Sequence, residues 1–184
     1  MNKNNKLLRI TLTALMAALC YVAFTFLQIK IPTPAGYTSF HLGNVFCVLG
    51  AILIDGVSGG IAGAIGMGIA DLFDPAYVLT VPKTVILKFF IGFITGTMAH
   101  KVLEIDEKEN ADKEIFISIL IGMLFNVAAE PLLSFFYYDL ILNNTDKAAS
   151  YLTIAKWTTT LVNATLTVVI GSALAIAIRK RFKR

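Results

Sequence analysis

The uncharged stretch ITLTALMAALCYVAFTFLQI occupies residues 10–29 of the 184-residue chain. About 20 mainly apolar residues suffice for a helix to cross the hydrocarbon core of a membrane. Basic residues precede the stretch, as they do in a signal peptide, but the apolar run continues well beyond the short core of such peptides. We therefore predict a retained membrane-spanning helix at residues 7–29.

The composition of the whole chain agrees with this prediction. Hydrophobic residues make up 57% of the chain and charged residues 15%, with a mean hydropathy of +0.73. A soluble domain carries about 25% charged residues, and a globule this small leaves too much surface outside to hide the surplus apolar side chains. The composition excludes an ordinary soluble enzyme, a disordered tail and a secreted disulfide scaffold. It predicts an integral membrane protein.

Apolar stretches and helix breakers divide the rest of the chain. Two prolines and a glycine in residues 31–37, IPTPAGY, end the first helix. Further apolar helices are predicted at residues 42–54, 57–72, 81–103, 115–138 and 155–178, with a charged, solvated loop at residues 101–114. The expected fold is an all-α bundle of six transmembrane helices, formed by a single domain that spans residues 1–184.

Basic residues cluster at the two ends of the chain and predict its orientation. Lys3, Lys6 and Arg9 lie at the start, and residues 179–184 contain five more lysines and arginines. Cytoplasmic segments of membrane proteins are enriched in such residues. An even number of helices puts both termini on one side, so we expect both in the cytoplasm. Nucleic-acid binding is the alternative interpretation, but no folded basic face accompanies the clusters, and we expect no nucleic-acid partner.

Small residues recur every four positions in the third predicted helix. Gly56, Gly60 and Ala64 form one such row. Rows of this kind let helix backbones approach closely in lipid, which favours tight packing within the bundle over a gating role. The first helix carries a similar small-residue face at residues 14–18, ALMAA, which needs a partner helix inside this chain or in another protein.

Ionisable residues inside a membrane span are costly and mark functional sites by default. The fifth predicted helix carries a polar stripe of Asn126, Glu130 and Ser134, and the other such residues are Asp71, Lys83, Lys88, Lys156 and Asn163. With a rise of about 1.5 Å per residue, all of them fall in the outer half of the membrane. This asymmetry predicts a pocket open to the outside, whereas a pore would continue inward. In the alternative interpretation, Lys88 and Glu130 only pair with each other.

The first outer loop adds uncharged polar and aromatic groups to this pocket. Tyr37, His41 and Asn44 are expected there, and the loop is suited to cover a flat, ring-shaped ligand. Trp157 would either stack on that ligand or anchor its helix at the membrane interface, where tryptophan is common. His41 has no second histidine or cysteine nearby, and no nucleophile lies beside a base. We expect no metal, no cofactor and no enzymatic activity.

Several of these segments resemble the substrate-binding S component of energy-coupling factor (ECF) vitamin transporters, in its riboflavin-type group. The resemblance rests on ALMAA at residues 14–18, FHLGNV at 40–45, GGIAGA at 59–64, DLFDP at 71–75 and the basic C-terminal tail. It implies a six-helix subunit of a prokaryotic plasma membrane, with cytoplasmic termini and an outward vitamin pocket. It also implies docking through Ala14 and Ala18 on a transmembrane coupling subunit that works with two ATPase subunits.

The resemblance assigns the vitamin pocket to the outer loop and the last three helices. The expected binding residues are Tyr37, His41, Asn44, Lys83, Lys88, Asn126, Glu130, Lys156 and Asn163. This mixture of lysine, glutamate and asparagine favours a small polar heterocycle, such as a pyridoxine-like or hydroxymethylpyrimidine compound. The alternatives are riboflavin, a self-sufficient ion-coupled carrier in which Glu130 and Asp71 titrate, and an assembly protein without a ligand.

Overall fold

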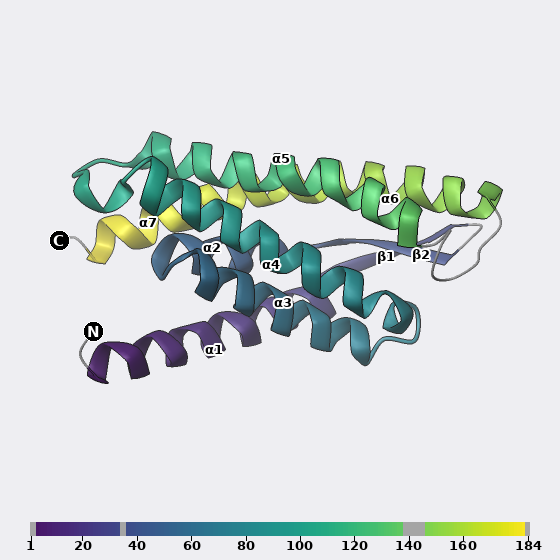
Figure 1. Cartoon of the computed structure of the whole chain (residues 1–184), viewed down its shortest axis with the longest axis horizontal. Coiled ribbons are helices and arrows are strands. Elements are labelled where there is room, and N and C mark those ends of the chain that lie inside the picture. Colours follow the sequence, from purple (N-terminus) through teal and green to yellow (C-terminus); the bar gives the residue numbers. More distant parts are fainter. Residues whose placement is uncertain (1–2, 34–35, 138–145, 183–184) are drawn as a thin grey trace.

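The computed structural model describes residues 3–33, 36–137 and 146–182, which form a helical bundle with one small sheet (Figure 1). The helices are α1 (Lys3–Phe26), α2 (Gly43–Leu53), α3 (Gly56–Leu72), α4 (Val81–Thr97), α5 (Asp112–Phe136), α6 (Asp146–Leu166) and α7 (Ser172–Phe182). The π-helical segment Met98–Val102 extends α4, and another, Thr167–Gly171, joins α6 to α7. Helices α6 and α7 are therefore joined into one continuous helical segment.

Four helical segments are long and apolar enough to cross a membrane, judged by length and composition over the described residues. They are Asn5–Phe26, Val78–Val102, Asp112–Phe136 and Ile154–Arg181. Helices α2 and α3 are apolar but shorter. Large apolar side chains such as Phe26, Leu124 and Val169 are exposed along the long helices. In water this surface would be unfavourable, so lipid is its natural solvent.

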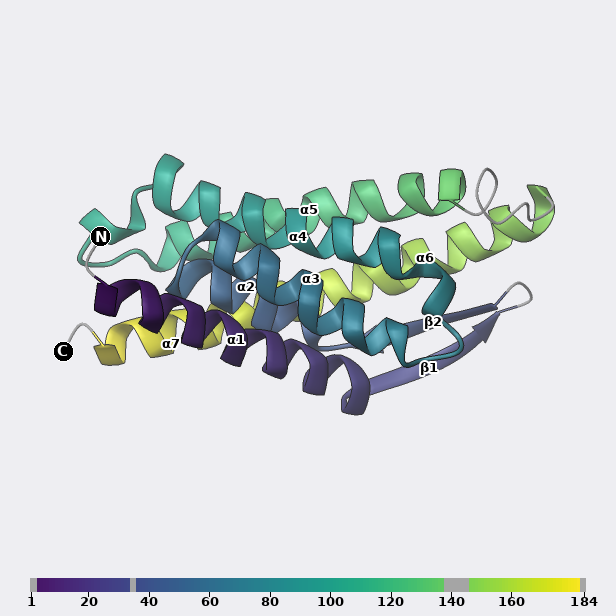
Figure 2. The ribbon, with the colours of Figure 1, turned by 60° about the horizontal axis from the view of Figure 1, so that its bottom comes forward.

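The bundle has two distinct ends. The start of α1 and the end of α7 lie together at one end, and the sheet lies at the other (Figures 1 and 2). Helix α4 runs between them and packs against both α3 and α5, while α1 packs against α2 and α3. We call the end with the sheet the outer end and the end with the termini the inner end.

Glycines let α3 and α4 approach backbone to backbone. A Cβ added to Gly60 would lie 2.5 Å from the carbonyl oxygen of Phe89, and one added to Gly56 would lie 2.7 Å from that of Phe93. Across the interface, added Cβ atoms on Gly92 and Gly96 would collide with the backbone of Gly60 and Gly56. Real Cβ atoms do not fit at such distances, so this crossing requires glycine. The packing role predicted for the glycine rows is confirmed.

The structure contains a small two-stranded sheet that was not predicted, so the all-α expectation was wrong in this respect. Helix α1 ends at Phe26, three residues before the predicted end, and the chain continues as β1 (Gln28–Thr33) and β2 (Gly36–His41). The strands pair antiparallel, from Gln28 opposite His41 to Thr33 opposite Gly36. Pro32 cannot donate to a ladder, but an edge strand tolerates it.

Two other predicted boundaries also differ. The last predicted helix begins at Asp146 instead of residue 155. The predicted loop 101–114 is shorter, because helical structure continues to Val102 and α5 begins at Asp112. Ile105 in this loop is fully buried, so the loop is anchored in the core. The predicted helix end at residue 138 lies outside the described residues.

Candidate ligand-binding site

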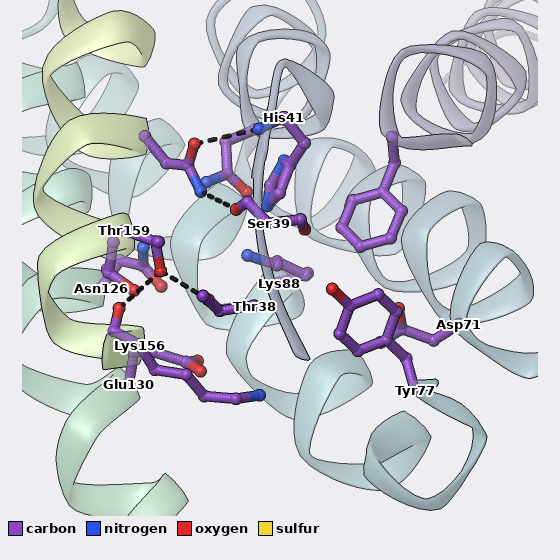
Figure 3. A pocket seen from close by; sticks show the side chains of 14 residues that line it. Thr38, Ser39, His41, Asp71, Tyr77, Lys88, Asn126, Glu130, Lys156 and Thr159 are labelled. Atoms are coloured by element: carbon purple, nitrogen blue, oxygen red, sulfur yellow. Dashed lines mark hydrogen bonds between the residues drawn. The ribbon is translucent and has the colours of Figure 1, made fainter. Parts of the chain in front are cut away.

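A cavity of about 60 Å³ lies where β2 meets the outer parts of the helices (Figure 3). Residues from six helices, one strand and one turn line it, and most of them are polar. They are Phe24, Thr38, Ser39, His41, Asn44, Asp71, Tyr77, Lys88, Asn126, Glu130, Lys156, Thr159, Thr160 and Asn163. A cavity needs roughly 10–15 Å³ to hold one water molecule. The space therefore holds several waters or a small polar group without rearrangement.

Strand β2 is fastened to α6 by direct hydrogen bonds. The backbone N–H of His41 donates to Oδ1 of Asn163 at 3.0 Å, and Nδ2 of Asn163 donates to the carbonyl oxygen of Ser39 at 3.0 Å. The hydroxyls of Thr38 and Thr159 lie 2.6 Å apart. The Asn163 amide thus holds β2 against α6, and β2 forms one wall of the cavity, its roof.

Two carboxylates line the cavity from different helices. Glu130 of α5 accepts at Oε1 from Lys83 Nζ at 2.6 Å and from the Ser134 hydroxyl at 3.2 Å. Asp71 of α3 accepts at Oδ2 from the hydroxyl of Thr84 at 2.5 Å. Both carboxylates therefore have a hydrogen-bonded partner that lies behind the cavity wall.

The Lys88 ammonium lies at the centre of the cavity in Figure 3. The residue is 8% exposed, and within the described part of the chain it makes no ion pair within 4 Å. The interpretation in which Lys88 pairs with Glu130 was wrong, because Glu130 pairs with Lys83. A buried ammonium without a partner is expensive, so this group is set up for a ligand or for water.

Several buried polar atoms of the lining residues have no hydrogen-bond partner among the described residues. They are Nδ1 of His41, both amide atoms of Asn44, Oδ1 of Asp71 and Oδ1 of Asn126. Each such atom costs about 1–3 kcal/mol if it stays unpaired. Buried polar groups in folded proteins are nearly always paired, so their concentration at one cavity indicates that water or a polar ligand fills it.

The structure brings most of the predicted binding residues together. His41, Asn44, Lys88, Asn126, Glu130, Lys156 and Asn163 all line the cavity. Two others lie elsewhere: Tyr37 is 47% exposed on the sheet, and Lys83 is buried behind Glu130. Trp157 is 48% exposed and lies outside the lining, which favours the interfacial interpretation.

The proposed docking residues Ala14 and Ala18 are both exposed on α1. Ala14 lines a separate apolar groove between α1 and α3, beside Ala17 and Ile61. The small-residue face of α1 is therefore only partly covered by this chain.

The sequence interpretation missed the contribution of the sheet. Thr38 and Ser39 reach the cavity from β2, and Phe24 lies beneath, with its ring 4.5 Å from that of His41. A usable signal was present: two six-residue segments, QIKIPT and GYTSFH, are rich in β-branched and aromatic residues and are separated by two residues. The prolines in residues 31–37 favoured a loop over a strand in the sequence analysis.

The arrangement is suited to binding a polar ligand. Among the described residues, no group of three or more histidines, cysteines or acidic residues is placed to hold a metal ion. The lining instead combines two carboxylates, two ammonium groups and several amides and hydroxyls. Such a set recognises a polar ligand by convergent hydrogen bonds.

Comparison with protein families agrees with this description. Residues 4–180 match the family model described as ECF-type riboflavin transporter, S component. The chain belongs to this family. No curated protein and no solved structure matches it significantly. As an S component of an ECF-type vitamin transporter, the protein is a membrane transport subunit that works with an ECF module and binds a vitamin.

Proposed function

We propose that the protein is the high-affinity binding subunit of an ECF importer in a prokaryotic plasma membrane. In this proposal, six spans cross the membrane and the inner end faces the cytoplasm. Support comes from the charge distribution: Lys6, Arg9, Arg179 and Lys180 gather at the inner end, as expected for cytoplasmic segments. The cavity then opens to the outside, where the vitamin is captured.

The partners in this proposal are a transmembrane coupling subunit and two ATPase subunits. The described residues form the bundle, and the sequence contains no phosphate-binding Gly-Lys-Ser/Thr motif. In this proposal, energy from ATP therefore comes from another chain. The exposed face at Ala14 and Ala18 is the proposed docking surface on the coupling subunit, since small residues allow close helix contact in lipid.

We propose a small polar heterocycle, such as a pyridoxine-like or hydroxymethylpyrimidine compound, as the ligand. The observation that carries this proposal is the set of unpaired buried polar atoms, on His41, Asn44, Asp71 and Asn126, around a cavity of about 60 Å³. A compact ring with several donors and acceptors would pair these atoms. A large apolar ring system would leave them unpaired.

Riboflavin is the second candidate, because the matching family model carries its name. Its three-ring system is larger than a pyridine or pyrimidine ring, so it would require a greater rearrangement of the cavity than the first candidate would, and we expect β1 and β2 to move away from α6. Asn163 and Thr159 would then lose their hydrogen bonds to β2. The two candidates therefore predict different changes on binding.

The first experiment is to identify the ligand that co-purifies with the protein in detergent, by denaturation and mass spectrometry. A stoichiometric pyridoxine-like or pyrimidine compound supports the first candidate, and riboflavin supports the second. If nothing co-purifies, titration calorimetry with pyridoxine, hydroxymethylpyrimidine and riboflavin follows. Failure of all three compounds to bind contradicts the proposed vitamin-binding function.

A further inference from the structure

The first turns of α4 hold both carboxylates of the cavity. Lys83 donates to Oε1 of Glu130 at 2.6 Å, and the next residue, Thr84, donates to Oδ2 of Asp71 at 2.5 Å. Lys83 and Thr84 are 4% and 8% exposed, and neither lines the cavity. Two consecutive residues outside the binding surface therefore each hold one acidic residue within it.

Helix geometry explains how neighbours in the sequence reach different walls. Consecutive residues of an α-helix point about 100° apart. Because α4 packs against both α3 and α5, Lys83 reaches Glu130 on α5 and Thr84 reaches Asp71 on α3. Figure 3 shows Asp71 and Glu130 on opposite sides of Lys88. The first turns of α4 thus connect two opposite walls of the cavity.

The contact from Thr84 uses one carboxylate oxygen of Asp71 and leaves the other. Asp71 accepts from Thr84 at Oδ2, while its buried Oδ1 has no partner among the described residues. Glu130 accepts from Lys83 and from the Ser134 hydroxyl at the same atom, Oε1. Ser134 in turn accepts from Lys83 at 2.8 Å. The lysine is thus held in a defined position by two oxygens.

The two contacts fix where the carboxylates point. A carboxylate on a flexible side chain loses rotamer freedom when it binds a ligand, and a partner that holds it beforehand removes part of that cost. Ion pairs and hydrogen bonds to charged groups are strong in a low-dielectric interior. Lys83 and Thr84 therefore preorganise the acceptors without touching the ligand.

We propose that Lys83 and Thr84 are positioning residues, which hold Glu130 and Asp71 as a pair of acceptors on opposite walls of the cavity. The bound vitamin then presents N–H or O–H donors on two opposite edges. This inference rests on the proposed function, and it names the polarity of the ligand at each wall.

The experiment is titration calorimetry of pyridoxine, hydroxymethylpyrimidine and riboflavin against purified full-length protein and its variants. Lys83→Met and Thr84→Val remove the two donors, while Lys83→Arg and Thr84→Ser retain them. We expect each removal to weaken binding about tenfold or more, and each conservative variant to bind within about threefold of wild type. The rescue separates a hydrogen-bonding role from a requirement for side-chain volume.

A double mutant tests whether Lys83 acts through Glu130. Lys83→Met leaves Glu130 buried without its partner and can unfold the chain, whereas the Lys83→Met/Glu130→Gln pair removes both charges. We expect this pair to bind as weakly as Glu130→Gln alone, with no further loss. The matched controls are Lys101→Met and Thr11→Val, both exposed and near the inner end, which should bind like wild type.

A direct test of the donor edges uses an analogue of the binding compound in which one N–H or O–H donor is methylated. We expect methylation to lower the affinity for the wild type. It should lower the affinity only a little for the variant that lacks the positioning residue of the same wall, Lys83→Met for Glu130 or Thr84→Val for Asp71. Equal losses in both proteins would contradict the assignment of donors to that wall.

The outcomes distinguish the two proposals. If the wild type binds one of the compounds and folded Lys83→Met and Thr84→Val bind it equally well, the positioning role is wrong and the proposed function stands. The same holds if the double mutant binds weaker than Glu130→Gln by the full Lys83→Met factor. If the wild type binds none of the three compounds, the proposed function fails and this inference falls with it.

Discussion

The outer and inner ends of the bundle use their polar groups in opposite ways. At the outer end, Asn44 and Asn126 carry buried polar atoms around a cavity and leave them without partners in the described structure. At the inner end, Arg9 pairs with Asp55 at 2.8 Å, and Lys180 pairs with Asp112 at 2.5 Å. These inner charged side chains are held in ion pairs, whereas several polar atoms at the outer cavity remain open to a ligand.

Close helix packing between the two ends offsets the free-energy cost of the unpaired polar atoms in the cavity. Lipid supplies no hydrophobic driving force between helices, so close packing has to stabilise them. Gly60 and Gly92 bring the backbones of α3 and α4 together. We call this glycine crossing of α3 and α4 the scaffold. It stabilises the bundle that carries the cavity, whose unpaired polar atoms are available to a ligand.

The largest expected effect is on the scaffold. Gly92→Leu places a side chain against the backbone of Gly60, where nothing can move aside. We expect a destabilisation of about 3 kcal/mol or more, seen as loss of the monodisperse peak in size-exclusion chromatography. Gly50→Ala is the control, because an added Cβ there would lie 3.4 Å from the nearest atoms of Gly59 and Met16, which is an ordinary contact distance. Equal yields of the two variants would contradict the division between scaffold and site.

The next effect separates binding from stability at one residue. Lys88→Met removes a buried ammonium that has no ion pair in the described residues. Ligand affinity should fall roughly 10- to 100-fold, because a hydrogen bond to a charged group contributes about 1.5–3 kcal/mol. The melting temperature without ligand should stay the same or rise, since the desolvation cost disappears.

Calorimetry and a thermal-shift assay on the same preparation check this prediction. Lys101→Met, an exposed lysine near the inner end, is the control and should change neither quantity. A marked drop in the melting temperature of ligand-free Lys88→Met would show that this lysine belongs to the scaffold.

A smaller effect concerns how the sheet is held at the outer end. Lys30 of β1 pairs with Asp74 at 2.6 Å and lies 5.8 Å from the ring centre of Tyr77, which lines the cavity. A partly exposed pair contributes up to about 1 kcal/mol, so Lys30→Ala should speed ligand dissociation by up to about fivefold. Stopped-flow measurement of the dissociation rate tests this, with Lys30→Arg expected to behave like wild type. An unchanged rate in Lys30→Ala would remove this pair from the binding process.

The smallest effect is at the inner end and depends on pH. Partial burial raises the pKa of Asp106, but the hydrogen bond from His100 and the charges of His100 and Arg179 outweigh it, so the pKa lies below its usual range. A lowered carboxylate pKa stabilises the fold above the pKa of the unfolded chain, and this contribution is lost as the pH falls through the folded value.

Asp106→Asn should therefore lower the melting temperature slightly at pH 7 and converge with wild type in strongly acidic solution. The Asp106 side chain is 64% exposed, so its ion pairs contribute at most about 1 kcal/mol at neutral pH. Ligand affinity should not change, because Asp106 is far from the cavity lining. A lost affinity would show that the two ends are coupled.

The helix positions were largely predictable because apolar runs and breakers are local signals. The predicted segments 42–54 and 57–72 agree closely with α2 (Gly43–Leu53) and α3 (Gly56–Leu72). The sheet was missed because β1 contains Pro32 and because the two strands pair only with each other. A proline near a strand is a weak guide to pairing, since edge strands accept it.

The site was predictable as a set of residues and unpredictable as a set of contacts. Helical periodicity and depth correctly gathered Lys88, Asn126 and Glu130 at one cavity. They did not indicate which lysine pairs with Glu130, because Lys83 and Lys88 both lie on α4 and differ only in the direction and height from which they face α5. Relative rotation of helices is set by packing, and packing involves the whole bundle.

By itself, the sequence determined that this chain belongs in lipid, that its helices cross closely at glycines and that its polar groups gather near one end, because hydropathy, residue size and the helical repeat are properties of each segment. Only the tertiary structure decided that β2 roofs the cavity, that Lys83 holds Glu130 and that Thr84 holds Asp71. Those contacts join residues far apart in the chain, and a hydrogen bond forms only where distance and direction are both satisfied.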